Sequence, residues 1–178
     1  MRYIDFISIG RIEPIKNFDY AFKIIKGIQA RYDINYHVVG NGSLLSKFKI
    51  KYAKNDKIVF HGEEPNYWVG HLLKSSKFLL HTSKVEGFGL TVLEAMLFGC
   101  IPIITPFNND MVKIVANNNG LIIRFNEVYR SIEECMDFYD GYKNNRLKFD
   151  MEKAKQYVIK NHDVHNLRDR YINIFFGE

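Results

Sequence analysis

Apolar and polar positions follow two patterns along the chain: short apolar runs, and longer segments whose apolar residues recur at helical spacing. The short runs predict strands at residues 3–9, 35–39, 57–60, 78–81, 101–104 and 121–123. The longer segments predict helices between them, at residues 17–32, 43–53, 65–73, 90–98 and 110–116. Strands separated by single helices form a parallel sheet that helices cover on both faces. The predicted fold class is therefore α/β, one doubly wound parallel sheet with C-terminal helices.

The strand pattern ends near Glu127, and polar helices are expected beyond it. The last of them is predicted at residues 164–176, with one apolar stripe along its length. That stripe consists of Leu167, Tyr171, Ile174 and Phe175. We therefore divide the chain into an α/β domain at residues 1–160 and a C-terminal amphipathic helix at residues 161–178.

Composition fits one ordinary globular domain. The 178 residues are 47% hydrophobic and 25% charged, which excludes extended disorder. The apolar run at residues 100–106 is far shorter than the roughly 20 residues of a membrane-spanning helix. Because the chain enters its first strand directly after Met1, without a leader, we expect a cytoplasmic location. Cys100 and Cys135 lack the paired spacing of a disulfide framework or a zinc site.

The formal net charge of +5 indicates an anionic partner. This partner could be nucleic acid, a phosphorylated small molecule or an acidic membrane surface. No nucleic-acid recognition motif supports the first of these, so no nucleic-acid partner is predicted. Lys47, Lys51 and Lys54 fall on one face of a predicted helix, where they form either a solvated surface or a peripheral contact with anionic lipid.

Ligands of doubly wound sheets bind beyond the carboxyl ends of the strands, so the loops that follow the strands are the places to search. The first strand ends in Gly10 and Arg11, and Lys16 follows shortly before a helix. Arginine offers a bidentate fork to phosphate oxygens and lysine a point charge, unless both are solvated loop charges. Asn17 is predicted to be the N-cap of the helix.

The second strand ends in Gly40-Asn41-Gly42, a turn that allows the backbone to approach a ligand ahead of a helix N-terminus. No third glycine follows, and no acidic residue stands at the later spacing that holds a ribose in dinucleotide-binding folds. NAD binding is therefore not expected, and no cofactor is assigned.

The most informative segment is residues 83–96, where a strand leads through a glycine-bracketed turn into a helix. The free N–H groups near Gly89 and Leu90 lie at the positive end of the helix macrodipole and form an anion cradle. Glu86 and Glu94 bracket this cradle. Because carboxylates repel phosphate, they are better suited to accept hydrogen bonds from sugar hydroxyls. The alternative is that Glu94 is a surface helix residue and Glu86 belongs to a solvated turn.

Together these segments resemble the retaining glycosyltransferases of family 4, group 1. The corresponding motifs are Glu-x7-Glu at Glu86 and Glu94, Gly-Arg-x4-Lys at Gly10, Arg11 and Lys16, and Gly-x-Gly at Gly40 and Gly42. They stand in the family's order and spacing, and they cover almost the whole chain. The resemblance implies the GT-B fold, in which two Rossmann-like domains face each other across a cleft. The match is to the C-terminal domain, which binds the nucleotide sugar.

The resemblance also implies a role for each matching residue. Arg11 and Lys16 would bind the donor diphosphate and stabilise the charge of the departing nucleotide. Glu86 would bind the transferred sugar and complete this catalytic set, while Glu94 would hold the ribose. The remaining substrate-binding positions would be Gly10, Gly40 and Gly42 together with the backbone of Phe88, Gly89 and Leu90. The base would lie near residues 58–63, and the absence of an Asp-x-Asp motif is consistent with a metal-independent reaction.

Two features depart from the family. Residues 106–110 replace a small-residue loop that contains glycine in relatives, so the sugar side of the pocket is expected to differ. The N-terminal, acceptor-binding domain is absent from this chain, which we interpret as an isolated domain or the product of a divided gene. The predicted helix at residues 161–178 would cross to that domain. His81, on an apolar strand, is expected to be a core or near-site residue rather than a catalyst.

The sequence thus predicts the donor-binding half of a retaining glycosyltransferase of hexosyltransferase type. Its expected pathway is surface polysaccharide or glycolipid synthesis, in the cytoplasm or at the inner face of the membrane. Its expected partners are a nucleotide sugar and an acceptor-binding domain or subunit, without which the chain would bind donor but not transfer sugar. The alternatives are half of a UDP-sugar epimerase of the same fold and a non-catalytic nucleotide-binding or interaction module.

Overall fold

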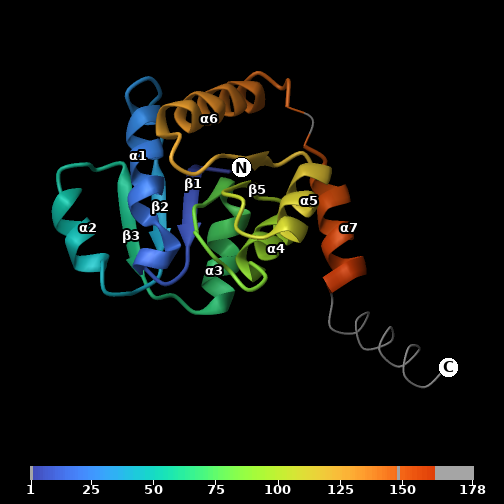
Figure 1. Cartoon of the computed structure of the whole chain (residues 1–178), viewed down its shortest axis with the longest axis horizontal. Coiled ribbons are helices and arrows are strands. Elements are labelled where there is room, and N and C mark those ends of the chain that lie inside the picture. Colours follow the sequence, from blue (N-terminus) through green and yellow to red (C-terminus); the bar gives the residue numbers. More distant parts are fainter. Residues whose placement is uncertain (1, 148, 163–178) are drawn as a thin grey trace.

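The computed structural model describes residues 2–147 and 149–162, and in these ranges one 6-stranded parallel sheet forms the centre of the molecule (Figure 1). The strands lie in the order β3-β2-β1-β4-β5-β6. They are β1 (Ile4–Ile9), β2 (Tyr36–Val39), β3 (Ile58–Gly62), β4 (Ser76–His81), β5 (Ile101–Ile104) and β6 (Leu121–Ile122). This confirms the predicted doubly wound sheet, and the strand order reverses between β1 and β4.

Helices follow the strands where the helical spacing predicts them. They are α1 (Phe18–Gln29), α2 (Leu45–Lys51), α3 (Asn66–Lys74), α4 (Leu90–Leu97), α5 (Asn109–Asn117), α6 (Val128–Lys143) and α7 (Met151–His162), with a short 3-10 helix, η1 (Pro14–Lys16), before α1. The helix α7 continues through residue 160, the last residue of the predicted α/β domain. It packs on α4 through Ala154 and Val158. The predicted helix at residues 164–176 lies outside the described residues.

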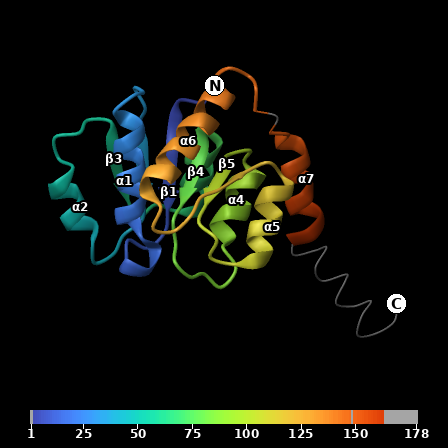
Figure 2. The ribbon, with the colours of Figure 1, turned by 45° about the horizontal axis from the view of Figure 1, so that its top comes forward.

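The two faces of the sheet are covered by different helices, as Figure 1 and Figure 2 show. One face packs against α1, α2 and α6, and the other against α3, α4, α5 and α7. Each face has its own apolar core, because alternate residues of a strand point to opposite sides. In β4, for example, Phe78 and Leu80 belong to the first core and Leu79 to the second.

The first core contains a cluster of aromatic rings around Phe22 of α1. The ring of Phe22 is 4.3 Å from that of Tyr52, 4.7 Å from that of Phe48 and 5.4 Å from that of Tyr36, measured between centroids. Phe22 is 1% exposed, so the whole side chain contributes to burial. This cluster fixes α1, and with it the loop that leads from β1 into the helix, against the sheet.

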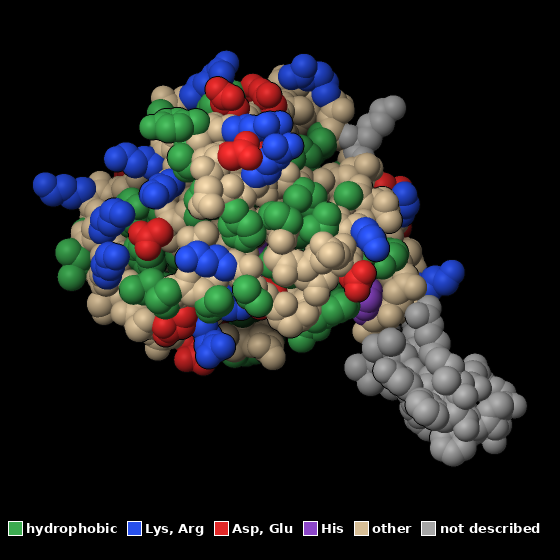
Figure 3. Space-filling view, viewed as in Figure 1, with side chains coloured by type: hydrophobic (Ala, Val, Ile, Leu, Met, Phe, Trp, Pro, Cys, Tyr) green, Lys and Arg blue, Asp and Glu red, His purple; other side chains and the backbone are tan. Residues whose placement is uncertain are grey.

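Charges of both signs lie on the face of the molecule that Figure 3 shows. There the Lys and Arg side chains lie among Asp and Glu. The predicted row of Lys47, Lys51 and Lys54 is wrong in one respect, because α2 ends at Lys51 and Lys54 lies in the turn beyond it. Lys51 lies 3.9 Å from a carboxylate oxygen of Asp19. None of the helices within residues 2–147 and 149–162 has the length and apolar character that crossing a bilayer requires.

The Phe22 cluster makes a testable prediction about stability. Replacing Phe22 by Ala should lower the free energy of unfolding by about 3–5 kcal/mol, because it removes a buried ring and leaves a cavity. The control is Tyr129→Ala at a side chain that is 82% exposed, for which the change should stay within about 0.5 kcal/mol. Urea unfolding followed by circular dichroism measures both. Equal effects of the two substitutions would show that this cluster does not hold α1 in place.

Candidate functional site

Two loops at the carboxyl edge of the sheet are packed directly on each other. The β1–α1 loop (residues 10–17) and the β2–α2 loop (residues 40–44) share backbone hydrogen bonds. The N–H of Ile12 donates to the carbonyl of Asn41 at 2.8 Å, and the N–H of Leu44 donates to the carbonyl of Ile12 at 3.1 Å. The two loops therefore form one rigid unit beside the point where the strand order reverses.

Glycine is required in the second loop because of this packing. A Cβ atom at Gly40, whose φ is +130°, would lie 2.0 Å from the carbonyl oxygen of Gly10, and one at Gly42 would lie 2.6 Å from that of Ile12. The Gly-x-Gly turn thus permits a close approach between two loops of the protein. Both glycines also line the pocket described below, so the approach to a ligand stays a prediction.

A side-chain contact between Glu13 and Ser43 also connects the two loops. One carboxylate oxygen of Glu13 accepts the N–H of Ser43 at 2.8 Å, and the other accepts its hydroxyl at 2.6 Å. These hydrogen bonds from Ser43 lower the pKa of Glu13 below its usual range. The pair was not identified from the sequence, since neither residue belongs to a motif.

A pocket of about 660 Å³ opens at this edge of the sheet. Its walls come from the ends of β1 and β2, from the segment after β3, and from α3 and α4. The lining residues are Ile9, Gly10, Arg11, Val39, Gly40, Asn41, Gly42, Glu63, Glu64, Asn66, Val69, Thr91 and Glu94. The pocket has the size of a small-molecule site and lies where doubly wound sheets bind ligands.

The charges of the pocket are not uniformly positive. Arg11 is the cation of the lining set, and the other charged members are Glu63, Glu64 and Glu94. Burial raises the pKa of Glu94. Its carboxylate forms no ion pair within residues 2–147 and 149–162. Such a carboxylate is stabilised in its charged form by any hydroxyl that donates to it. The arginine and the carboxylates therefore suit different parts of one ligand, an anionic part and a polyhydroxylated part.

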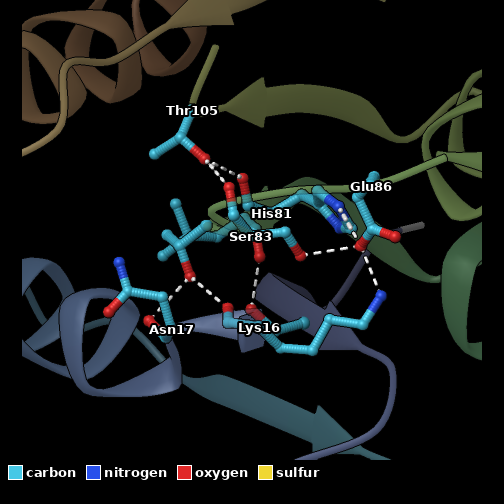
Figure 4. Close-up of polar contacts among 9 residues, drawn as sticks. Lys16, Asn17, His81, Ser83, Glu86 and Thr105 are labelled. Carbon is cyan, nitrogen blue, oxygen red and sulfur yellow. Dashed lines mark hydrogen bonds and ion pairs between the residues drawn. The ribbon is translucent and has the colours of Figure 1, made fainter. Parts of the chain in front are cut away.

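Lys16 and Glu86 form an ion pair next to this pocket (Figure 4). Their side chains are 17% and 15% exposed. The same carboxylate oxygen, Oε1 of Glu86, accepts the hydroxyl of Ser83 at 2.7 Å and lies 3.1 Å from Nε2 of His81. Oε2 of Glu86 makes no hydrogen bond within the part of the chain described, and in Figure 4 it points away from Ser83 and His81. One oxygen is thus held by the protein and the other is available to a ligand.

The environment of Glu86 strongly favours the charged form. Its contacts with His81, Lys16 and Ser83 lower its pKa from 4.5 to about 2, although partial burial acts in the opposite direction. At neutral pH the group is therefore a carboxylate that accepts hydrogen bonds.

Lys16, His81, Ser83 and Glu86 form a polar cluster, here called the Glu86 cluster. Two threonines connect it to the sheet. Thr82 donates its hydroxyl to the carbonyl of Asn17 at 3.0 Å, which attaches the β1–α1 loop to the end of β4 (Figure 4). Thr105, after β5, donates its hydroxyl to the carbonyl of Ser83 at 2.8 Å, and its N–H donates to the carbonyl of His81 at 3.0 Å. The cluster is thereby positioned by three neighbouring strands, β1, β4 and β5.

The loop from β4 to α4 (residues 82–89) presents its backbone at the start of α4. Gly89 adopts the left-handed conformation at the N-cap of α4, with a φ of 86°. Phe88 and Leu90 are 39% and 66% exposed. The β5–α5 loop, in which the sequence departs from the family, braces this segment: Asn108 donates to the carbonyl of Gly87 at 3.2 Å, and the Phe107 ring occupies the space that a Cβ at Gly89 would need.

The structure separates the predicted site residues into two neighbouring groups. Gly10, Arg11, Gly40, Gly42 and Glu94 line the pocket. Lys16 and Glu86 form the adjacent ion pair, while Phe88, Gly89 and Leu90 lie at the start of α4 and are not among the pocket lining. Of residues 58–63, which were expected near the base, Glu63 reaches the pocket wall.

The predicted N-cap position of Asn17 is confirmed, since it is the N-cap of α1. Its side chain makes no capping hydrogen bond, however, because the residue is in the left-handed conformation with a φ of 54°. This conformation ends η1, whose carbonyl at Pro14 accepts the N–H of Asn17. The turn between η1 and α1 thus overrides the preference of Asn for the capping role.

Sequence reasoning missed Ser83 and left the position of His81 open. Ser83 stands three residues before Glu86, a spacing at which a hydroxyl can reach back to a loop carboxylate. That signal was present in the sequence. Across residues 2–147 and 149–162, no group of three His, Cys, Asp or Glu side chains converges in a way that could hold a metal ion. Cys100 and Cys135 are buried free thiols.

Comparison with known proteins gives a consistent family. The sequence model described as glycosyl transferases group 1 matches residues 2–161. A relative from Klebsiella pneumoniae, described as an uncharacterised 41.2 kDa protein in the cps region, is 22% identical over 174 residues, which make up 97% of this chain and 46% of that protein. The chain therefore spans less than half the length of this relative.

Two solved structures share the fold. The pneumococcal O-GlcNAc transferase GtfA, solved in complex with UDP and GlcNAc, is 19% identical with a TM-score of 0.77, over 96% of this chain and 35% of GtfA. The C-terminal domain of a glycosyl transferase group 1 family protein, LpcC of Francisella tularensis, is 23% identical with a TM-score of 0.71. That match covers 90% of this chain and 87% of the other, so the two share one fold over nearly their whole lengths.

The loop packing predicts which glycine of the site is essential for stability. Gly40→Ala should lower the free energy of unfolding by about 2–4 kcal/mol, because the new Cβ meets backbone at a positive φ. Gly87→Ala is the matched control, since no atom lies within 4 Å of a Cβ there, and its effect should stay within about 0.5 kcal/mol. Chemical unfolding measures both. A tolerated Ala at position 40 would refute the packing explanation.

The Glu86 cluster predicts a dependence of stability on pH. Because the pKa of Glu86 is lower in the folded protein than in the unfolded chain, its stabilising effect is present above about pH 4.5 and is lost as the pH falls towards 2. The difference in unfolding free energy between the wild type and Glu86→Gln should reach about 3 kcal/mol at pH 6 and shrink over that range. Exposed Glu133→Gln on α6 is the control. A difference that does not change with pH would contradict the assignment.

Proposed function

Because the chain belongs to the glycosyl transferases group 1 family, we propose that it is the donor-binding half of a retaining glycosyltransferase. It would bind a nucleoside-diphosphate sugar and present the sugar to an acceptor. The observation that carries this proposal is a pocket at the reversal of strand order, lined by one arginine and several carboxylates, beside the Lys16–Glu86 pair. The pneumococcal neighbour with UDP and GlcNAc supports a donor of this class.

The nucleoside occupies the pocket in this proposal. Glu94 accepts hydrogen bonds from the ribose hydroxyls, since its carboxylate is free within the described residues and its pKa is raised by burial. The segment with Glu63 and Glu64 lies towards the base. These carboxylates exclude the diphosphate from their end of the pocket, so the phosphates lie at the opposite end, near Arg11.

The diphosphate is stabilised by protein cations and by the start of α4. When the bond between the anomeric carbon and the phosphate oxygen breaks, its electron pair remains on that oxygen, and negative charge grows on the diphosphate. Arg11 offers two parallel N–H donors to this charge. Lys16 gives one of its three ammonium protons to Glu86 and keeps the others for the phosphate. The N–H groups at the start of α4 add the positive end of the helix dipole. No metal ion or cofactor is part of this proposal.

Glu86 would bind the transferred sugar through Oε2, the oxygen that makes no hydrogen bond among the residues the structure describes. A carboxylate with one oxygen fixed and one open recognises a hydroxyl without having to reorganise. The acceptor-binding part is a separate domain or subunit in this proposal, because the chain covers less than half of the Klebsiella relative. The isolated chain is then expected to bind donor but not to transfer sugar. The fold shared with WaaG, described as a glycosyltransferase involved in lipopolysaccharide biosynthesis, supports a role in polysaccharide or glycolipid synthesis.

Isothermal calorimetry with UDP, GDP and their sugar derivatives tests the proposal. Arg11→Ala and Glu94→Ala should each weaken binding of the preferred nucleotide sugar about tenfold or more, because each removes a contact with a charged group. Lys23→Ala, outside the pocket lining, and Glu133→Ala, on α6, are controls that remove the same charges elsewhere. Binding to no nucleotide, or binding that neither pocket substitution affects, would overturn the proposal.

A further inference from the structure

His81 is a buried polar side chain whose position in the apolar sheet needs an explanation. It is the last residue of β4 and is 5% exposed. Its ring packs edge-on against that of Phe107, with 5.0 Å between the centroids. Burying an imidazole costs free energy unless its nitrogen atoms find polar partners, and an apolar side chain would fill this space without that cost.

Nε2 of His81 lies 3.1 Å from Oε1 of Glu86 (Figure 4). The ring N–H is not aligned with that oxygen, and within the described ranges Nε2 makes no hydrogen bond. The two residues come from the end of a strand and from the following loop, so their contact fixes the loop relative to the sheet. Ser83 holds the same oxygen from within that loop. Lys16 is the third partner, and it comes from the β1–α1 loop.

These three partners differ in what donor binding demands of them. The proposed function requires Lys16 to share its ammonium with the diphosphate, which weakens its hold on Glu86. Ser83 and His81 are both buried and are not among the residues that line the pocket. Donor binding therefore does not require either of them to contact the ligand. Of these two, Ser83 belongs to the loop that carries Glu86, whereas His81 belongs to the sheet. His81 is therefore the partner that can hold the carboxylate in a fixed direction when Lys16 turns to the donor.

We propose that His81 is a positioning residue for sugar recognition. It holds Oε1 of Glu86, so that Oε2 faces the donor sugar while Lys16 binds the diphosphate. This inference rests on the proposed function. In the donor complex, where Lys16 shares its ammonium with the diphosphate, Nε2 turns its proton to Oε1 and donates to it. Loss of this contact affects the part of the ligand that Glu86 recognises, the sugar, and leaves the nucleoside diphosphate bound as before.

The matched variants are His81→Gln and His81→Met. Both side chains are unbranched and similar in size, but only Gln retains an N–H donor near the position of Nε2. Calorimetry compares UDP with UDP-glucose and UDP-N-acetylglucosamine, and GDP with GDP-mannose. His81→Met should weaken binding of the preferred nucleotide sugar about 5- to 20-fold and leave binding of its nucleoside diphosphate within about twofold, whereas His81→Gln should restore most of the loss.

The outcomes separate this inference from the proposed function. If the wild type binds none of these ligands, the proposed function fails. If it binds a nucleotide sugar, but His81→Met weakens the sugar-bearing and sugar-free ligands equally, or His81→Gln is no better than His81→Met, His81 has only a packing role.

A measurement on the wild type covers the case in which His81→Met does not fold. Long-range proton–nitrogen NMR spectra report which imidazole nitrogen carries the proton. We expect Nε2 of His81 to be protonated in the complex with the nucleotide sugar. An unprotonated Nε2 in that complex would overturn the inference, because it could not donate to Glu86.

Discussion

Oε1 of Glu86 joins the loop after β1 to the end of β4 and to its own loop, and the candidate site depends on these contacts. Lys16 reaches it from the loop after β1, Ser83 from the loop that carries Glu86, and His81 from the end of β4. A largely buried carboxylate is stable only with such compensation, since desolvation alone would favour its neutral form. The three partners therefore hold Glu86 charged, and they also set the distance between the β1–α1 and β4–α4 loops.

Backbone packing gives the surrounding loops the same rigidity. Gly40 lets the β2–α2 loop contact Gly10 so closely that no side chain fits between them. Thr82 and Thr105 connect the end of β4 to the segments that follow β1 and β5. The pocket and the ion pair are thus both formed before any ligand binds. Preorganised polar groups of this kind do not have to be reoriented when charge develops during a reaction.

Much of the fold could be predicted from the sequence, because it depends on periodicity. The alternation of apolar runs and helical spacing identified the strands and helices of the described α/β sheet, with small differences at their ends. Asn17 was placed correctly at the N-cap of α1, but its side chain makes no capping hydrogen bond, because the preceding turn holds the residue in the left-handed conformation. The Gly-x-Gly turn was located correctly, but its packing against the β1–α1 loop could not be predicted, because a sequence does not show which neighbour a glycine faces. In the same way, the spacing of Glu86 and Glu94 could not show that one is in an ion pair and the other lines a pocket.

In the proposed complex a nucleotide sugar binds between Arg11 and Glu94, with its sugar directed at Glu86. An NMR titration of the nitrogen-15-labelled chain with UDP-glucose and GDP-mannose locates the ligand. The preferred ligand should shift the backbone amide signals of Gly10, Arg11, Gly40 and Thr91, and the sugar-bearing form should also shift the signal of Glu86. Shifts confined to the second hollow of the carboxyl edge, around Lys23, Lys84 and Asn126, would contradict this placement.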